Sequence, residues 1–160
     1  MIAGCRAHPR SALRKDSSRA RLRAALPPNS GAISGASENP NKVGGRPVHY
    51  LKKFGFKGKS YPINPTRTEI QGERCYPSLR DLPEAPEMVI VAVAGDNAIA
   101  AVEDCAAFGV KIAVVMASGF GEVDAIAGKA KERRLVEAAH RAGMRIVGPN
   151  AHGLANVGTG

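Results

Sequence analysis

Short apolar runs alternate with helical patterns after residue 30, and this alternation is the feature that most constrains the fold. Residues 60–64, 88–94, 111–117 and 144–147 are rich in Val and Ile, and the runs are too short for helices. Such runs are typical of strands that are buried on both faces of a parallel sheet. A weaker first strand is expected at 31–34, where the sequence GAIS is short and contains glycine.

Helical patterns occupy the segments between these runs. They are predicted over 46–56, 97–109 and 125–143, with Asp96 as an N-cap and with Gly109 and Gly143 as stops. Strands that alternate with helices form βαβ units with right-handed crossovers. The sequence therefore predicts an α/β fold, a Rossmann-like open parallel sheet with helices on both faces, in a single domain.

The net charge of +9 belongs mainly to the N-terminal segment. Residues 1–30 hold six Arg and one Lys against Asp16, a net of +6, which leaves +3 for the other 130 residues. We predict a disordered basic arm over 1–30 and one domain over 31–160. Nucleic-acid binding through the arm is the least favoured function, because the arm is short and only 4% of the chain is aromatic.

The distribution of cysteine and apolar residues predicts a cytoplasmic protein without a membrane span. The three cysteines are scattered and have no C-x-x-C spacing, which favours free thiols in a reducing compartment. No apolar run approaches the 18 residues that a membrane-spanning helix needs. No His, Cys or carboxylate cluster has the spacing of metal ligands, so no metal site is predicted.

Small and turn-forming residues follow each predicted strand. Open α/β sheets bind ligands outside the carboxyl ends of their strands, where glycines let the backbone approach a phosphate closely. The chain has neither G-x-x-x-x-G-K-[ST] nor G-x-G-x-x-G, and no acidic residue lies beside Asn64-Pro65 at the end of the second strand. These absences disfavour P-loop enzymes and NAD as a ligand, and a different nucleotide-like ligand is left open.

An ordered series of motifs resembles one family. GASENPNKVGG at 35–45, YPINP at 61–65, CYPSLRDLPE at 75–84, SGFGE at 118–122 and GPN-x-x-G at 148–153 resemble the CoA-binding domain of NDP-forming acyl-CoA synthetases. This group includes the α-subunit of succinyl-CoA synthetase. The resemblance covers about residues 31–160 in order and at the expected spacing, which is more specific than any single glycine loop.

The resemblance implies coenzyme A as the ligand, bound along the strand ends. In the first loop it assigns contacts to Ser37 and to Lys42, Val43 and Gly44, and beside the nucleotide to Asn64 and Pro65. Further contacts are implied at Ala94, at the backbone of Ala117, Ser118 and Gly119, and at Asn150 near the thiol. Arg67 is added on chemical grounds, because a guanidinium suits phosphate geometry.

No catalytic residue is assigned. In the family, the phosphorylated histidine and the ATP-grasp module lie in further domains or on another subunit, so the chain is expected to supply the CoA-holding part of acyl-CoA synthesis and not to be competent alone. His152 lies nearest the predicted ligand edge, but no carboxylate or nucleophile accompanies it in the motif. A stand-alone CoA-sensing or subunit-docking module without catalytic activity is the alternative.

Overall fold

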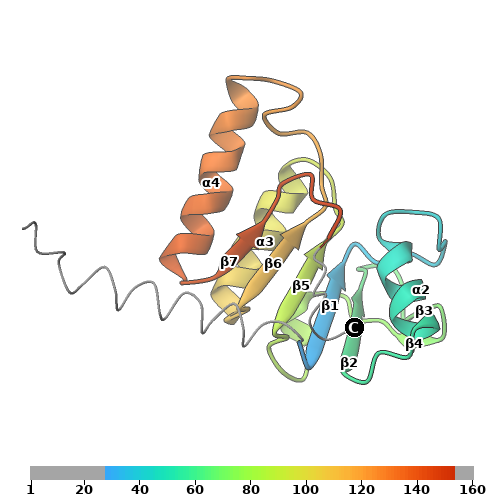
Figure 1. The fold of residues 1–160 in the computed structure, drawn as a ribbon. Helices are drawn as coiled ribbons and strands as arrows, with labels where there is room; N and C mark the ends of the chain where they lie inside the picture. Colours follow the sequence, from blue (N-terminus) through green and yellow to red (C-terminus); the bar gives the residue numbers. More distant parts are fainter. Residues whose placement is uncertain (1–27, 154–160) are drawn as a thin grey trace, which may run out of the picture.

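Five parallel strands form the central sheet. The structure is a computed structural model, and it describes residues 28–153, so almost all of the predicted arm lies outside the described residues. The strands are β1 (Ser30–Ser34), β2 (Lys59–Ile63), β5 (Met88–Val91), β6 (Ile112–Val115) and β7 (Arg145–Val147). Their order is β2-β1-β5-β6-β7, and every pairing is parallel (Figure 1). The predicted parallel sheet is confirmed.

The weakest strand in the sequence is central in the sheet. β1 pairs with β2 on one side and with β5 on the other, and its Ala32 and Ile33 are each 1% exposed on opposite faces. The short sequence GAIS predicts a strand only weakly. Its hydrogen-bond partners and its burial come from the neighbouring strands β2 and β5. Tertiary context therefore decides this element.

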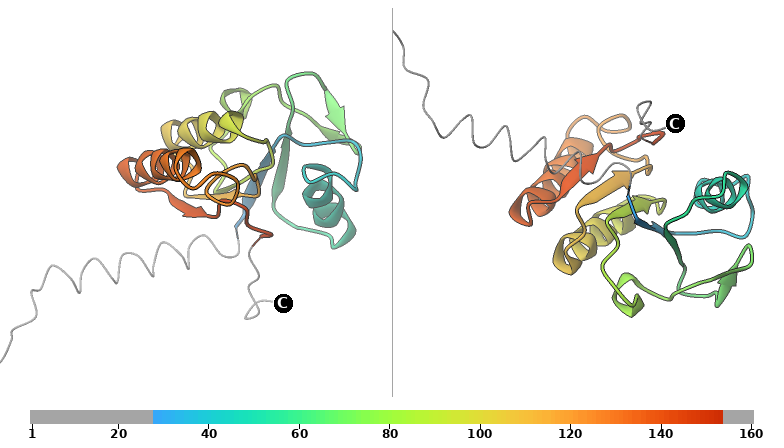
Figure 2. Two further views of the ribbon diagram at one scale, coloured as in Figure 1. Left: turned by 90° about the horizontal axis from the view of Figure 1, so that it is seen from above. Right: turned by 60° about the horizontal axis from the view of Figure 1, so that its bottom comes forward.

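Helices cover both faces of the sheet, as predicted. Helix α2 (Gly45–Lys53) packs Val48 against Ile33 on one face. Helices α3 (Asp96–Phe108) and α4 (Ala127–Arg141) lie together on the other face, which Figure 2 shows on its left. Their apolar side chains share one cluster with Val89 and Val91 of β5, and this cluster is the main core.

The predicted helix ends are correct in part. Gly109 follows α3 in the left-handed conformation with a φ of 84°, as its role as a stop requires. Asp96 is not an N-cap, because Gly95 occupies that position and Asp96 is the first residue of the helix. The Asp96 carboxylate instead forms an ion pair with Lys131 of α4, with 2.9 Å between Asp96 Oδ1 and Lys131 Nζ.

The connection from β2 to β5 contains elements that the sequence did not predict. A two-stranded antiparallel hairpin, β3 (Glu69–Ile70) and β4 (Glu73–Arg74), precedes the short 3-10 helix η1 (Leu79–Asp81). Ile70 is fully buried in the same cluster as Val48 of α2. The hairpin therefore packs on the α2 side of the sheet.

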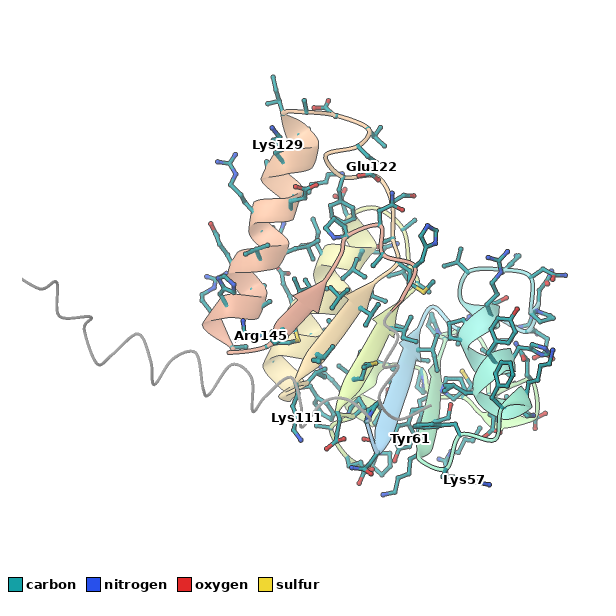
Figure 3. All side chains as sticks on the ribbon, viewed as in Figure 1. Lys57, Tyr61, Lys111, Glu122, Lys129 and Arg145 are labelled. Carbon is teal, nitrogen blue, oxygen red and sulfur yellow. The ribbon has the colours of Figure 1, made fainter. Side chains whose placement is uncertain are left out.

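Ion pairs and hydrogen bonds occupy the amino edge of the sheet. Lys59 bonds Glu84 at 2.9 Å, and Lys111 bonds Glu87 at the same distance. Burial and the hydrogen bond to Glu84 raise the pKa of Tyr61 to about 12. Tyr61 and Lys111 lie at the lower end of the sheet in Figure 3, away from the loops at the opposite edge. Among the helices of residues 28–153, none is long and apolar enough to cross a membrane.

Candidate functional site

The loops that follow all five strands gather at one edge of the sheet, because the strands are parallel (Figure 1). The chain runs from β1 outward to β2 and then returns past β1 to β5, so the direction of winding reverses between β1 and β5. A crevice outside the carboxyl ends of two such strands is where doubly wound sheets bind ligands. The candidate site is therefore the carboxyl edge around β1 and β5.

The first loop, residues 35–44 between β1 and α2, is held by hydrogen bonds to the end of β2 and within itself. The N–H groups of Gly35 and Ala36 donate to Ile63 O at 3.1 and 3.0 Å, and the N–H of Ser37 donates to Gly44 O at 3.3 Å. Within residues 28–153, the N–H groups of Val43 and Gly44 have no hydrogen-bond partner. Val43 is exposed and Gly44 is buried, so the Lys42–Gly44 segment offers one exposed backbone donor and a second unpartnered one directly beneath it, both of which suit an anion.

Two glycines let this loop close tightly. A Cβ added at Gly44 would lie 1.9 Å from Gly35 O, and one added at Gly45 would lie 1.9 Å from Asn39 O. Both contacts are with backbone atoms, which cannot swing away as the end of a flexible side chain could. No larger residue fits at either position without displacing the loop.

Positive charge surrounds this loop. Lys42 and Arg67 are exposed, and so is Arg46, which lies in the first turn of α2. None of these three side chains has an ion-pair partner among the described residues. Residues 39–68 carry seven basic side chains and no acidic one, namely Lys42, Arg46, Lys52, Lys53, Lys57, Lys59 and Arg67, although Glu38 lies just before this stretch, in the loop. Lys59 pairs with Glu84 at the amino edge of the sheet and Lys52 pairs with Glu73. The cations that favour an anionic ligand at the first loop are therefore Lys42, Arg46 and Arg67.

Asn64 has a structural role that its sequence position did not reveal. Its amide Nδ2 donates to Ala36 O at 2.9 Å, and its Oδ1 accepts from the N–H and hydroxyl of Thr66 at 3.0 and 2.9 Å. Asn64 thus joins the end of β2 to the first loop, and Pro65 beside it is exposed at the edge. A direct ligand contact of Asn64 or Pro65 stays a prediction.

The start of α3 faces the same edge directly after β5. Ala94 is exposed, and Gly95 has a φ of 60° with open space where a Cβ would stand. The first-turn N–H groups of Asp96 and Asn97 have no partner in the described part of the chain. The positive end of this helix dipole therefore lies beside the crevice, next to the carboxylate of Asp96 itself.

Two carboxylates accept hydrogen bonds from backbone N–H groups in the loop between β6 and α4. Glu122 accepts from the N–H of Gly119 at 2.6 Å and of Phe120 at 3.2 Å, and Glu132 accepts from the N–H of Gly121 at 3.0 Å. Glu122 lies at the upper edge in Figure 3. The N–H of Gly119 is thus already bonded within the protein, and a contact of Gly119 with a ligand stays a prediction.

The other residues predicted on this side differ in how accessible they are. Ser118 is exposed, whereas Ala117 is buried and its carbonyl accepts the N–H of Asn150 at 3.0 Å. Asn150 is exposed and has a φ of 54°, a backbone conformation that asparagine tolerates better than most residues. Ser118 and Asn150 are therefore the polar side chains from the prediction that remain open to a ligand here.

Glu122 gives a prediction for pH dependence. Hydrogen bonds from its own N–H and those of Gly119 and Phe120 lower the pKa of Glu122 from the ordinary value of 4.5. A lowered folded-state pKa contributes stability above the unfolded value and loses it as the pH falls through the folded value. We expect Glu122→Gln to flatten the fall in Tm below about pH 4.5, measured by calorimetry. Equal slopes in both proteins would contradict this role.

Neither described cysteine has the properties of a nucleophile. Cys105 is 1% exposed in the main core, where burial raises the pKa of its thiol to about 12, and Cys75 is 6% exposed and has its thiol pKa raised by burial. His152 is exposed and hydrogen-bonds no described residue. Over residues 28–153, no group of three His, Cys, Asp or Glu side chains is arranged to hold a metal ion. Cys5 and His8 lie outside the described residues.

The sequence analysis did not identify two residues that contribute to this region, Arg46 and Gln71. Arg46 is signalled by the run of basic residues without acids, which becomes visible when charge is counted in windows. Gln71, in the turn of the β3–β4 hairpin, donates to carbonyls at both ends of the first loop. No local pattern indicates Gln71, because its partners lie 34 and 26 residues away.

A protein-family model described as "CoA binding domain" matches residues 29–156 of the chain. The chain is 41% identical over 139 residues to acetate–CoA ligase (ADP-forming) II of Archaeoglobus fulgidus, covering 87% of this chain and 20% of that enzyme. It is 38% identical over 125 residues to the α subunit of acetate–CoA ligase (ADP-forming) II of Pyrococcus furiosus, covering 78% of this chain and 27% of the subunit.

A solved structure shares the fold. The apo form of the dinucleotide-forming acetyl-coenzyme A synthetase 1 of Ca. Korarchaeum cryptofilum aligns with a TM-score of 0.75 at 41% identity, covering 81% of this chain and 28% of that one. The chain thus spans between a fifth and a third of the length of these relatives.

Proposed function

Because this chain belongs to the CoA-binding domain family, we propose that it binds coenzyme A across the carboxyl edge of its sheet. We further propose that it is the CoA-holding part of an NDP-forming acyl-CoA synthetase, which joins an acid to CoA at the expense of an NTP. The phosphate-transfer chemistry would then belong to a phosphohistidine domain and an ATP-grasp module or subunit. The proposed location is the cytoplasm.

The observation that carries this proposal is the combination of hydrogen-bond donors and positive charge at the first loop. It combines two unpartnered N–H groups, at Val43 and Gly44, with the exposed cations Lys42, Arg46 and Arg67. Backbone donors and cations together suit the phosphate groups of CoA. Ser118 and Asn150 lie on the β6–β7 side of the same edge, and neither is charged. The thiol end of CoA carries no charge and would lie there.

Calorimetry with the whole chain tests the binding step. At a hundredfold excess over its Kd, CoA stabilises a one-site protein by about 2.7 kcal/mol, which corresponds to a rise in Tm of about 6–10 °C for a domain of this size. We expect saturable binding and such a shift. A folded protein that shows neither at millimolar CoA would refute the proposal.

Reconstitution tests the catalytic assignment separately. Addition of an ATP-grasp subunit together with the phosphohistidine domain is expected to restore acid- and CoA-dependent NDP release. CoA binding without any restored activity would instead favour the stand-alone sensing or docking module.

A further inference from the structure

Gln71 occupies a backbone conformation that glutamine rarely adopts. It and Gly72 form the two-residue turn between β3 and β4, with φ values of 52° and 78°. A turn with two positive φ values in a hairpin favours Asn-Gly or Gly-Gly, because these residues tolerate the left-handed region. A glutamine at the first position therefore breaks a local rule, and such exceptions persist where another contact compensates for them.

The side chain of Gln71 makes the compensating contacts. Its Nε2 donates to the carbonyl oxygens of Ser37 and Gly45, both at 3.0 Å, in a partly buried position. Its backbone N–H donates to Glu38 Oε2 at 2.8 Å, and its carbonyl accepts from Lys52 Nζ. One amide group thus joins the hairpin to the first loop at two points.

The two carbonyls that Gln71 binds stand at opposite ends of the first loop. Ser37 is the third residue after β1, and Gly45 is the first residue of α2. The unpartnered N–H groups of Val43 and Gly44 lie between these two anchor points. Fixing both ends before a ligand arrives lowers the ordering cost that binding must otherwise meet.

We infer that Gln71 is a positioning residue for the CoA-binding loop, acting through Ser37 and Gly45 without touching the ligand. This inference rests on the proposed CoA binding at that loop. The positioning role needs the length of the glutamine side chain and the two N–H donors of its amide. An asparagine amide is one methylene shorter, and a glutamate carboxylate donates no hydrogen bond.

Gln71→Asn separates this role from a merely structural one. Asparagine suits a positive φ better than glutamine, so the Tm should stay level or rise, whereas loss of the two bonds should weaken CoA binding about tenfold. Gln71→Met keeps the length and the strained conformation but loses both donors, so it should weaken CoA binding equally and also lower the Tm. Affinity is measured by calorimetry and Tm by thermal unfolding.

Glu73→Gln is the matched control in the same hairpin. It removes the 3.9 Å ion pair with Lys52 without touching the loop, and CoA affinity should not change. Unchanged affinity in Gln71→Asn would overturn the inference. A parallel fall of Tm and affinity in Gln71→Asn would also overturn it, because the residue would then be merely structural.

Amide hydrogen exchange on the free protein tests the inference independently of CoA. Gln71→Asn should speed exchange in residues 38–44 and leave β5 and β6 unchanged. Unchanged exchange in that loop would overturn the positioning role. Should the wild type fail to bind CoA while the loop still loosens in the variant, the proposed ligand would be wrong and the anchoring by Gln71 correct.

Discussion

Gly44→Ala is expected to weaken CoA binding on the order of a hundredfold or more and to destabilise the fold by about 3 kcal/mol. The added Cβ would stand 1.9 Å from Gly35 O and 2.9 Å from Gly35 C. These atoms cannot yield cheaply, because the N–H of Gly35 is bonded to Ile63 O in the neighbouring strand. The loop must therefore move, and the N–H donors of Val43 and Gly44 move with it.

Gly31→Ala is the control for this substitution. Gly31 lies in β1 itself, has no positive φ, and would bring its Cβ no closer than 4.0 Å to Met88 O. It should bind CoA within about twofold of wild type, given the ordinary contact at that site. Thermal unfolding and calorimetry on both variants provide the comparison. A Gly44→Ala protein with wild-type affinity would show that this loop does not hold the ligand.

The layers of the fold could be predicted from the sequence because their signals are local. β5 and β6 are continuous apolar runs, since α3 and α4 cover one of their faces and apolar side chains such as Ile112 and Val114 are buried on the other. The end of α3 at Gly109 depends on this residue alone, because glycine adopts a positive φ at low cost. Such features need no knowledge of distant contacts.

The elements that the sequence did not reveal depend on distant contacts. Each strand of the β3–β4 hairpin has two residues, which is too short for any periodicity to register. Its turn residue Gln71 looks unlike a turn residue until Ser37 and Gly45 are seen beside it. Asp96 resembles an N-cap in the sequence, but its carboxylate pairs instead with Lys131 of another helix.

The candidate site could be predicted as a place but not as a set of free atoms. Parallel topology alone brings the carboxyl ends of the five strands to one edge of the sheet. The glycine-rich turns that follow the strands therefore indicate the position of the candidate site. Which donors stay free depends on the internal hydrogen bonds of each loop. Glu122 occupies the N–H of Gly119, whereas the N–H groups of Val43 and Gly44 stay without a partner among the described residues.

The second large effect is expected from reversing charge at the edge. Lys42→Glu combined with Arg46→Glu should weaken CoA binding about a hundredfold or more, because each lost charge-assisted hydrogen bond contributes about 1.5–3 kcal/mol. Both side chains are exposed and neither forms an ion pair in the described structure, so the Tm should change little. The dependence of affinity on salt should also become shallower, since salt screens the attraction that wild type retains.

Lys53→Glu combined with Lys57→Glu changes the net charge by the same amount at a different place. Lys53 ends α2, so it lies a helix length from Arg46, and Lys57 is at the lower end of the molecule in Figure 3. Calorimetry across a salt series compares the two double variants with wild type. If CoA recognises local cations at the first loop, the control keeps wild-type affinity at moderate salt. Equal losses in both variants would mean that net charge alone attracts CoA, and the loop would lose its assigned role.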